Sequence, residues 1–168
     1  MSIQTVEIIF DACSLINLVN GRVLDKVLTL PNTSWSIGNI VHEECTRIPF
    51  PELESEVSNG TIGLLDDSDI DAADFLDLLD LHKLGNGETE CIAYASKFDY
   101  VVSTDDRKTR QVIERDLGKQ KLTGSIGLLK RCVESDFLTA EEAKASYERM
   151  VVLGAFLPIL DSDHFDNK

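Results

Sequence analysis

The sequence predicts an α/β protein: a three-layer α/β/α sandwich around a mainly parallel central sheet. Short apolar runs such as VEIIF, TSWSI and YVVST alternate with longer segments of helical periodicity. This alternation favours parallel strands joined by helical crossovers. The chain has 168 residues, of which 43% are hydrophobic, so it is long enough for one domain with its own core.

Apolar periodicity and turn residues define the elements of the first half. The helix that follows the second strand has Asn39 as its expected N-cap. The expected elements are a strand at 6–10, two short helices within 12–30, a strand at 33–37, a helix at 39–48, a loop with a short polar helix at 49–60, and a strand at 61–65.

The second half continues the same alternation. Glycines at 85–87 separate an acid-rich helix from the next one. The expected elements are helices at 69–84 and 88–98, a strand at 100–104, a helix at 105–118, a short strand at 121–123 and a long helix at about 139–153. We find no repeat and no domain boundary, so we predict a single domain over 1–168, with residues from about 139 as a helical extension.

Charge and composition exclude some classes of protein. The chain has 16 basic and 30 acidic residues, for a formal charge of -14, the opposite of a protein that coats DNA electrostatically. No segment approaches the roughly 18 apolar residues of a membrane span, and no leader-like N-terminus is visible. The four cysteines form no C-x-x-C pair, which favours reduced core residues in a cytoplasmic protein.

Acidic residues follow two of the predicted strands directly. Asp11 comes after VEIIF, and Asp105 and Asp106 come after YVVST. In open parallel sheets, ligands bind beyond the carboxyl ends of the strands, where these side chains would meet. Asp11 and Asp106 also precede helices, so each could simply be an N-cap.

Helical phase distinguishes inward from outward glutamates. Glu44 shares an apolar stripe with Val41 and Cys45, whereas Glu43 lies four residues before Arg47, as an exposed ion pair would. We therefore expect Glu44 to face the sheet.

The next helix contains a second inward glutamate. Glu88 shares a face with Ile92 and Ala95, whereas Glu90 lies on the face of Tyr94. Glu88 is therefore the expected inward residue, although it could also simply favour the positive end of its helix. Several carboxylates at one sheet edge would repel one another and need a divalent cation, and oxygen ligands suit Mg²⁺ or Mn²⁺.

Five segments match, in order, those of a known family: FDACSLINLV, IVHEEC, GETECIAYA, VVSTDDRKTR and GSIGLLKR. Together they resemble the PIN-domain nucleases, and within them the subgroup with G-E-x-E and D-D-R-x-x-R segments. The resemblance covers most of the chain. It implies a three-layer fold with a carboxylate-bound Mg²⁺ or Mn²⁺ that cleaves single-stranded RNA. Many such proteins are toxins, which implies an antitoxin partner and a homodimer.

The resemblance assigns four carboxylates as catalytic metal ligands: Asp11, Glu44, Glu88 and Asp106. The third acid of the family is usually an Asp, so Glu88 departs from the pattern and Glu90 stays open, with Asp105 as a further alternative ligand. Ser14 matches a small hydroxyl residue that follows the first Asp in the family, and we expect it to contact the substrate.

A basic segment follows the last acid of the motif. Arg107, Arg110 and Lys119 are the residues in it that we expect to bind the RNA backbone. The full set also contains Lys108, Arg115, Lys121, Lys130 and Arg131. The competing explanation is an ordinary solvated helix face.

Other functions fit the sequence less well. An aspartate-nucleophile phosphatase needs a second Asp two residues after the first, where this chain has Cys13. A receiver domain needs an isolated acceptor Asp after a middle strand, and GNGETE is not a G-x-G-x-x-G turn. The main alternative is a PIN-like protein that binds RNA or a partner without cutting.

Overall fold

The computed structural model describes residues 4–48 and 50–166. Within them, five strands form one all-parallel sheet in the order β3-β2-β1-β4-β5. The strands are β1 (Val6–Phe10), β2 (Thr33–Ile37), β3 (Ile62–Leu64), β4 (Val101–Ser103) and β5 (Leu122–Thr123). The predicted domain limits at residues 1 and 168, and position 49 of the predicted loop, lie outside the described residues.

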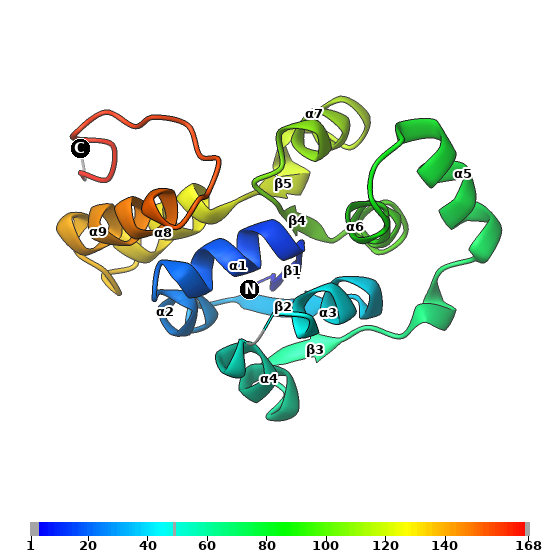
Figure 1. The fold of residues 1–168 in the computed structure, drawn as a ribbon, viewed down its shortest axis with the longest axis horizontal. Helices are drawn as coiled ribbons and strands as arrows, with labels where there is room; N and C mark the ends of the chain where they lie inside the picture. The colour runs from blue at the N-terminus through cyan, green and yellow to red at the C-terminus, as the bar shows by residue number, and fades with distance from the viewer. Residues whose placement is uncertain (1–3, 49, 167–168) are drawn as a thin grey trace.

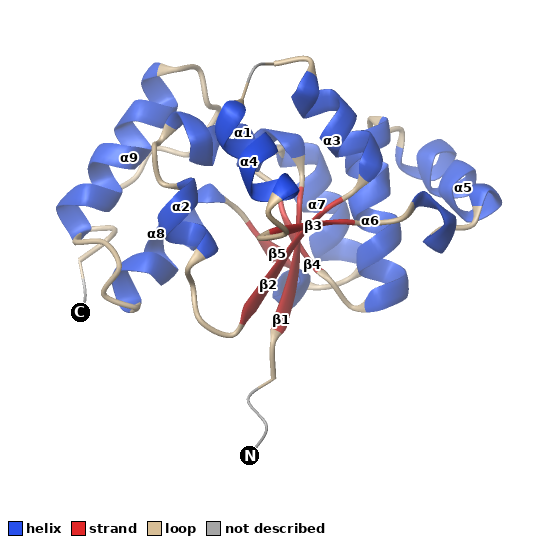
Figure 2. Cartoon of the chain, turned by 90° about the horizontal axis from the view of Figure 1, so that it is seen from below, coloured by secondary structure: helices blue, strands red, loops and turns tan. Residues whose placement is uncertain are grey.

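Helices connect the strands and cover both faces of the sheet, so the predicted fold class is confirmed. The helices are α1 (Ala12–Asn20), α2 (Leu24–Leu28), α3 (Asn39–Thr46), α4 (Pro51–Ser58), α5 (Ala72–His82), α6 (Asn86–Phe98), α7 (Arg107–Asp116), α8 (Ser125–Glu134) and α9 (Ala140–Val152). In Figure 1, α8 and α9 lie at one end of the molecule and α5 at the other. Figure 2 shows the strands between α2, α8 and α9 on one side and α5 and α6 on the other.

The strand order reverses at β1. The chain moves outward through β2 and β3, then returns to add β4 and β5 on the other side of β1. The carboxyl ends of β1 and β4 therefore form the switch point, where the helices that follow the two strands diverge and leave room for a ligand. Phe10 lies opposite Ser103 in this pairing, so Asp11 and Thr104 leave the sheet next to each other.

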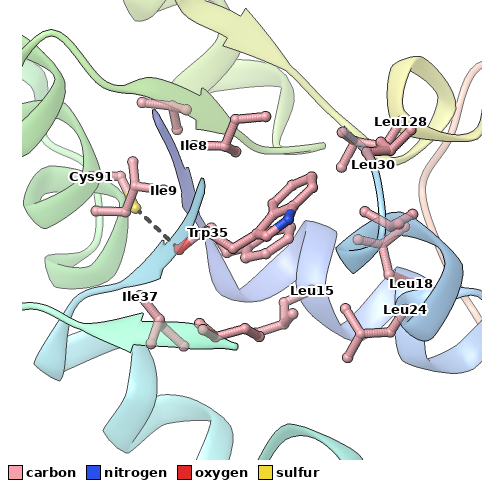
Figure 3. Close-up of a cluster of buried hydrophobic side chains, with 14 of the residues drawn as sticks. Ile8, Ile9, Leu15, Leu18, Leu24, Leu30, Trp35, Ile37, Cys91 and Leu128 are labelled. Carbon is pink, nitrogen blue, oxygen red and sulfur yellow. Dashed lines mark hydrogen bonds between the residues drawn. The ribbon is translucent and has the colours of Figure 1, made fainter. Parts of the chain in front are cut away.

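The core surrounds the central strands. Buried and exposed side chains do not alternate at the end of β1. Ile8, Ile9 and Phe10 are all buried, as expected for a strand covered on both faces. Figure 3 shows the side chains packed around Trp35, whose ring stacks on Phe10 with the centroids 5.2 Å apart. All four cysteines are free thiols, and three of them are buried.

No helix within the described residues is long and apolar enough to cross a membrane.

Helix α9 packs against α1 and α8. Its Met150 is fully buried, and a Cβ added to Gly21 at the end of α1 would lie 2.5 Å from the Met150 Cε. The Arg149 guanidinium also donates to the Gly21 carbonyl at 3.1 Å. The predicted extension is therefore part of the packed structure.

We predict that Met150→Ala destabilises the protein by about 2 to 4 kcal/mol, because it empties a closely packed site. The control is Val152→Ala, two residues along the same helix, where the side chain is 83% exposed. This control should change the unfolding free energy by less than about 0.5 kcal/mol in urea titrations. Equal effects of the two changes would mean that α9 does not pack as described.

Candidate active site

Asp11 lies at the switch point and is 2% exposed. Its Oδ1 accepts the Ala12 N–H at 2.8 Å, so it is the N-cap of α1, as the structural alternative predicted. Its Oδ2 accepts from the Thr104 hydroxyl at 2.7 Å and from the Cys13 thiol at 2.9 Å. One cap needs one acceptor, and the Thr104 donor shows that the carboxylate is also held from the residue that follows β4.

The pKa of Asp11 is raised to about 6: burial is the largest cause and the charge of Glu88 adds to it, whereas the hydrogen bonds to the carboxylate oppose it. The three donors are therefore too weak to compensate for the loss of water around the carboxylate. A carboxylate at a strand end whose cost of burial exceeds the stabilisation from its hydrogen bonds is a candidate functional residue.

Glu44 of α3 and Glu88 of α6 face the same region. Burial raises the pKa of Glu44, the charge of Glu88 raises it further, and the backbone of Gly87 lowers it. Both glutamates are half-buried. The charge of Glu88 thus raises the pKa of both Asp11 and Glu44, and a cation bound near these carboxylates would relieve that repulsion.

The prediction for the outward face of α6 was wrong. Glu90 is only 3% exposed and Tyr94 is 1% exposed. The reason is that α6 packs on β1 and β4 with one side and against α3 and α5 with others, so two of its faces are buried. The Glu90 carboxylate accepts the N–H groups of Ile40 and Val41 at 3.1 and 3.0 Å.

A cavity of about 310 Å³ borders Glu90 on the side of α5. Its lining is largely apolar and includes Ile40, Phe75 and Tyr94. A phosphodiester needs polar and cationic contacts, so this cavity is a poor candidate for the substrate site.

Asp106 and Asp105 follow β4 and cap two different helices. The Asp106 Oδ2 accepts from the backbone N–H and the hydroxyl of Thr109, at 2.7 and 2.8 Å, at the start of α7. Asp105 accepts the Ser125 N–H at 2.9 Å at the start of α8, and the Asn17 amide at 2.8 Å. The Ser125 hydroxyl also donates to Asp105. Asp105 is thus occupied at both oxygens, whereas the bonds to Asp106 fall on one.

Ser14 is placed differently from the substrate contact that we expected. It is completely buried, and its hydroxyl donates to the Ser103 carbonyl at 2.7 Å. It therefore joins α1 to β4 and does not reach the surface from which a substrate would approach.

The basic segment is divided between two edges of the sheet. Arg107 begins α7 next to Asp106, but Lys119 begins the short 3-10 helix that leads into β5 and so lies at the amino edge. The ten residues of α7 span about 15 Å between these points. Arg110 is half-buried and donates to the carbonyls of Thr104 and Thr123 at 2.8 and 3.0 Å, which ties β4 to β5.

The carboxylate oxygens of the candidate site suit a hard cation, but the carboxylates are too far apart in this structure to hold one. Within 4–48 and 50–166, no three His, Cys, Asp or Glu side chains come together closely enough to hold a metal ion. The convergent groups are nevertheless carboxylates, which are the oxygen ligands of Mg²⁺ and Mn²⁺. Burial and the Asp11 charge raise the pKa of the Cys13 thiol, so it stays a protonated donor and not a thiolate ligand.

A family model described as a PIN domain matches residues 7–159. The chain belongs to the PIN-domain family. PIN domains are generally nucleases, and the switch-point carboxylates lie within the matched range. No curated protein sequence matches the chain.

The fold of this chain is also similar to that of a solved structure. The crystal structure of PAE2754 from Pyrobaculum aerophilum matches with a TM-score of 0.53 and 16% sequence identity. The match covers 78% of this chain and 99% of that one. At this identity the similarity establishes the fold alone.

Sequence reasoning missed two residues that hold Asp11 in this PIN domain. Thr104 is the last residue before the acidic pair, and Cys13 lies two residues after Asp11. Each also accepts a backbone N–H, from Asp106 and Asp105 respectively, both at 3.2 Å. Their positions at the two strand ends were a usable signal, because parallel strands bring such residues together.

We predict that Asp11→Asn makes the metal-free protein more stable above about pH 6. The pKa of Asp11 is raised on folding from 3.8 to about 6, so the folded state keeps a proton that the unfolded state releases. This contribution to stability is full below pH 3.8, falls as the pH rises to about 6, and is lost above it. Asn carries no such charge. The stability of Asp11→Asn relative to the parent should therefore be roughly 2 kcal/mol more favourable at pH 7 than at pH 4.

Urea titrations at both pH values in EDTA measure this difference. Asp77→Asn, an exposed change on α5, is the matched control and should follow the parent at each pH. An Asp11→Asn advantage that is the same at pH 4 and pH 7 would show that the carboxylate is not strained by burial.

Proposed function

We propose that this PIN domain is a metal-dependent endoribonuclease that cleaves single-stranded RNA. The observation that supports it most is the gathering of carboxylates at this edge of the sheet: buried Asp11 at the end of β1, and half-buried Glu44 and Glu88 facing the same region. Structural carboxylates normally find a donor or a cation within the protein. Here the charge of Glu88 instead raises the pKa of both Asp11 and Glu44, which is the pattern expected of a site completed by a ligand.

In this proposal the metal ligands are Asp11, Glu44, Glu88 and Asp106. A bound Mg²⁺ or Mn²⁺ would lower the pKa of a water molecule and stabilise the leaving oxygen of the phosphodiester. Asp11 is held in place by its three donors, and Asp106 keeps one oxygen free of the Thr109 bonds. Glu44 and Glu88 would have to turn toward Asp11, because their present spacing holds no ion.

The substrate contact that we retain is Arg107, which is exposed and adjoins Asp106. Arg110 would act indirectly by holding the ends of β4 and β5. On the family resemblance alone, we extend the proposal to a toxin with a protein antitoxin, to a homodimer and to a cytoplasmic location.

A non-catalytic PIN-like protein that binds RNA or a partner is the second candidate. Two observations favour it: no metal-binding group of three forms within the described residues, and Asp105 and Asp106 both serve as helix caps. The two candidates differ in whether RNA is cut when Mn²⁺ is added.

We predict that Asp11→Asn and Glu88→Gln each lower Mn²⁺-dependent cleavage of single-stranded RNA at least about a hundredfold. Such a loss corresponds to roughly 2.7 kcal/mol of transition-state stabilisation. Each change keeps the shape of the side chain and removes its charge, and product analysis on gels measures the rates. If the parent binds RNA but yields no products with Mg²⁺ or Mn²⁺, the non-catalytic candidate is correct.

We predict that Arg107→Ala weakens RNA binding, because one phosphate contact is lost. The slope of the logarithm of the affinity against the logarithm of the salt concentration should become shallower by about one. Lys119→Ala removes the same charge at the opposite edge of the sheet, and it should leave the RNA affinity and its salt dependence unchanged. Fluorescence anisotropy over a series of salt concentrations measures the two slopes. Equal effects of the two substitutions would mean that RNA does not bind preferentially at the carboxyl edge.

A further inference from the structure

Helices α3 and α6 both begin without a capping side chain of their own. Their N-cap residues are Gly38 and Gly85, and neither helix has a side-chain cap from its own first turn. The first N–H groups of a helix have no partner within the helix and need one from outside it. The expected cap, Asn39, lies inside α3 and does not fill this role.

Glu90 supplies the missing cap of α3 from the neighbouring helix. One carboxylate oxygen accepts the Ile40 N–H at 3.1 Å, and the other accepts the Val41 N–H at 3.0 Å. The side chain is 3% exposed, so both bonds are shielded from water. A carboxylate at this position also interacts favourably with the positive end of the helix dipole.

Glu44 is directed the other way, from α3 toward the start of α6. It lies on α3, one turn after the residues bound by Glu90, and it faces the backbone of Gly87 in the first turn of α6. A Cβ on Gly87 would be 2.6 Å from the Glu44 Oε2. The two helices therefore meet through one glutamate from each, directed at the start of the other.

We infer that Glu90 is a positioning residue, which ties the start of α3 to α6 and thereby sets Glu44 beside Glu88. This inference rests on the proposed function, because it assigns Glu90 a task in the proposed metal site. Glu90 is not assigned as a ligand, since it is only 3% exposed and both of its oxygens are directed at the backbone N–H groups of α3. Glu90, the second glutamate of the GETE segment, thus acts through Glu44, the second glutamate of α3.

Gly38 provides the means to test this. A Cβ at position 38 would collide with the Glu90 carboxyl group, so a cap from residue 38 and the cap from Glu90 exclude each other. Position 38 has φ -78° and ψ 162°, the backbone conformation of an ordinary N-cap. Gly38→Ser combined with Glu90→Ala should therefore cap α3 locally while removing the link to α6.

The experiment compares the parent, Glu90→Ala and the double variant by three measurements. Amide hydrogen exchange at Ile40 and Val41 reports the cap. Calorimetric titration with Mn²⁺ reports the metal site, and RNA cleavage reports activity. Glu43→Ala removes an exposed charge from the same helix and should match the parent in all three.

We expect Glu90→Ala to lose amide protection and at least about tenfold in Mn²⁺ affinity, the loss typical of residues that orient metal ligands. The double variant should regain amide protection but not Mn²⁺ affinity. Glu90→Gln, which keeps the volume and one acceptor, should lose less affinity than Glu90→Ala and provides a folded comparison.

Two outcomes would overturn the inference alone. Mn²⁺ affinity restored together with the cap in the double variant would reduce Glu90 to a simple helix cap. Unchanged affinity in Glu90→Ala would remove its role altogether. A parent that neither binds Mn²⁺ nor cleaves RNA would instead overturn the proposed function, and with it the site that Glu90 is inferred to position.

Discussion

The pairing of β1 with β4 is the constraint on which the rest of the site depends. Phe10 lies opposite Ser103, and the Asp11 N–H donates to the Ser103 carbonyl at 2.9 Å. This register sets the Thr104 hydroxyl against the Asp11 carboxylate. Alternate residues of a strand point to opposite faces, so a shift by one residue would turn Thr104 away. The carboxylate would then be buried with one donor fewer and a larger desolvation cost.

The side chains whose placement the sequence predicts correctly are those that depend on a strand end or on one helix face. Asp11 and Asp106 follow strands directly, and parallel topology brings such positions to one edge. Glu44 lies in phase with Val41, which is fully buried. In each case a local pattern together with one general rule of α/β folds is sufficient. The sequence alone therefore predicts the fold, and with it the carboxylates that lie at this edge of the sheet.

The residues that sequence reasoning misplaced depend on contacts between distant segments. Helical phase divides α6 into an inward and an outward face, but α3 and α5 cover the outward face and bury Glu90. Asn39 is a good N-cap type, yet the cap of α3 comes from Glu90, fifty residues from Ile40. Lys119 belongs to a cluster in the linear sequence, but α7 carries the chain to the opposite edge before reaching it. Periodicity and charge clustering contain no information about these arrangements.

The exclusion between Gly38 and Glu90 restricts the order in which the two positions can change during evolution. A side chain gained at position 38 first would collide with the Glu90 carboxyl group and be removed by selection. Loss of the glutamate first leaves two N–H groups of α3 without their acceptor, which is costly but leaves the backbone in place. The same serine is therefore harmful before the loss at position 90 and beneficial after it. Such sign epistasis makes these two residues a pair that should vary together among related chains.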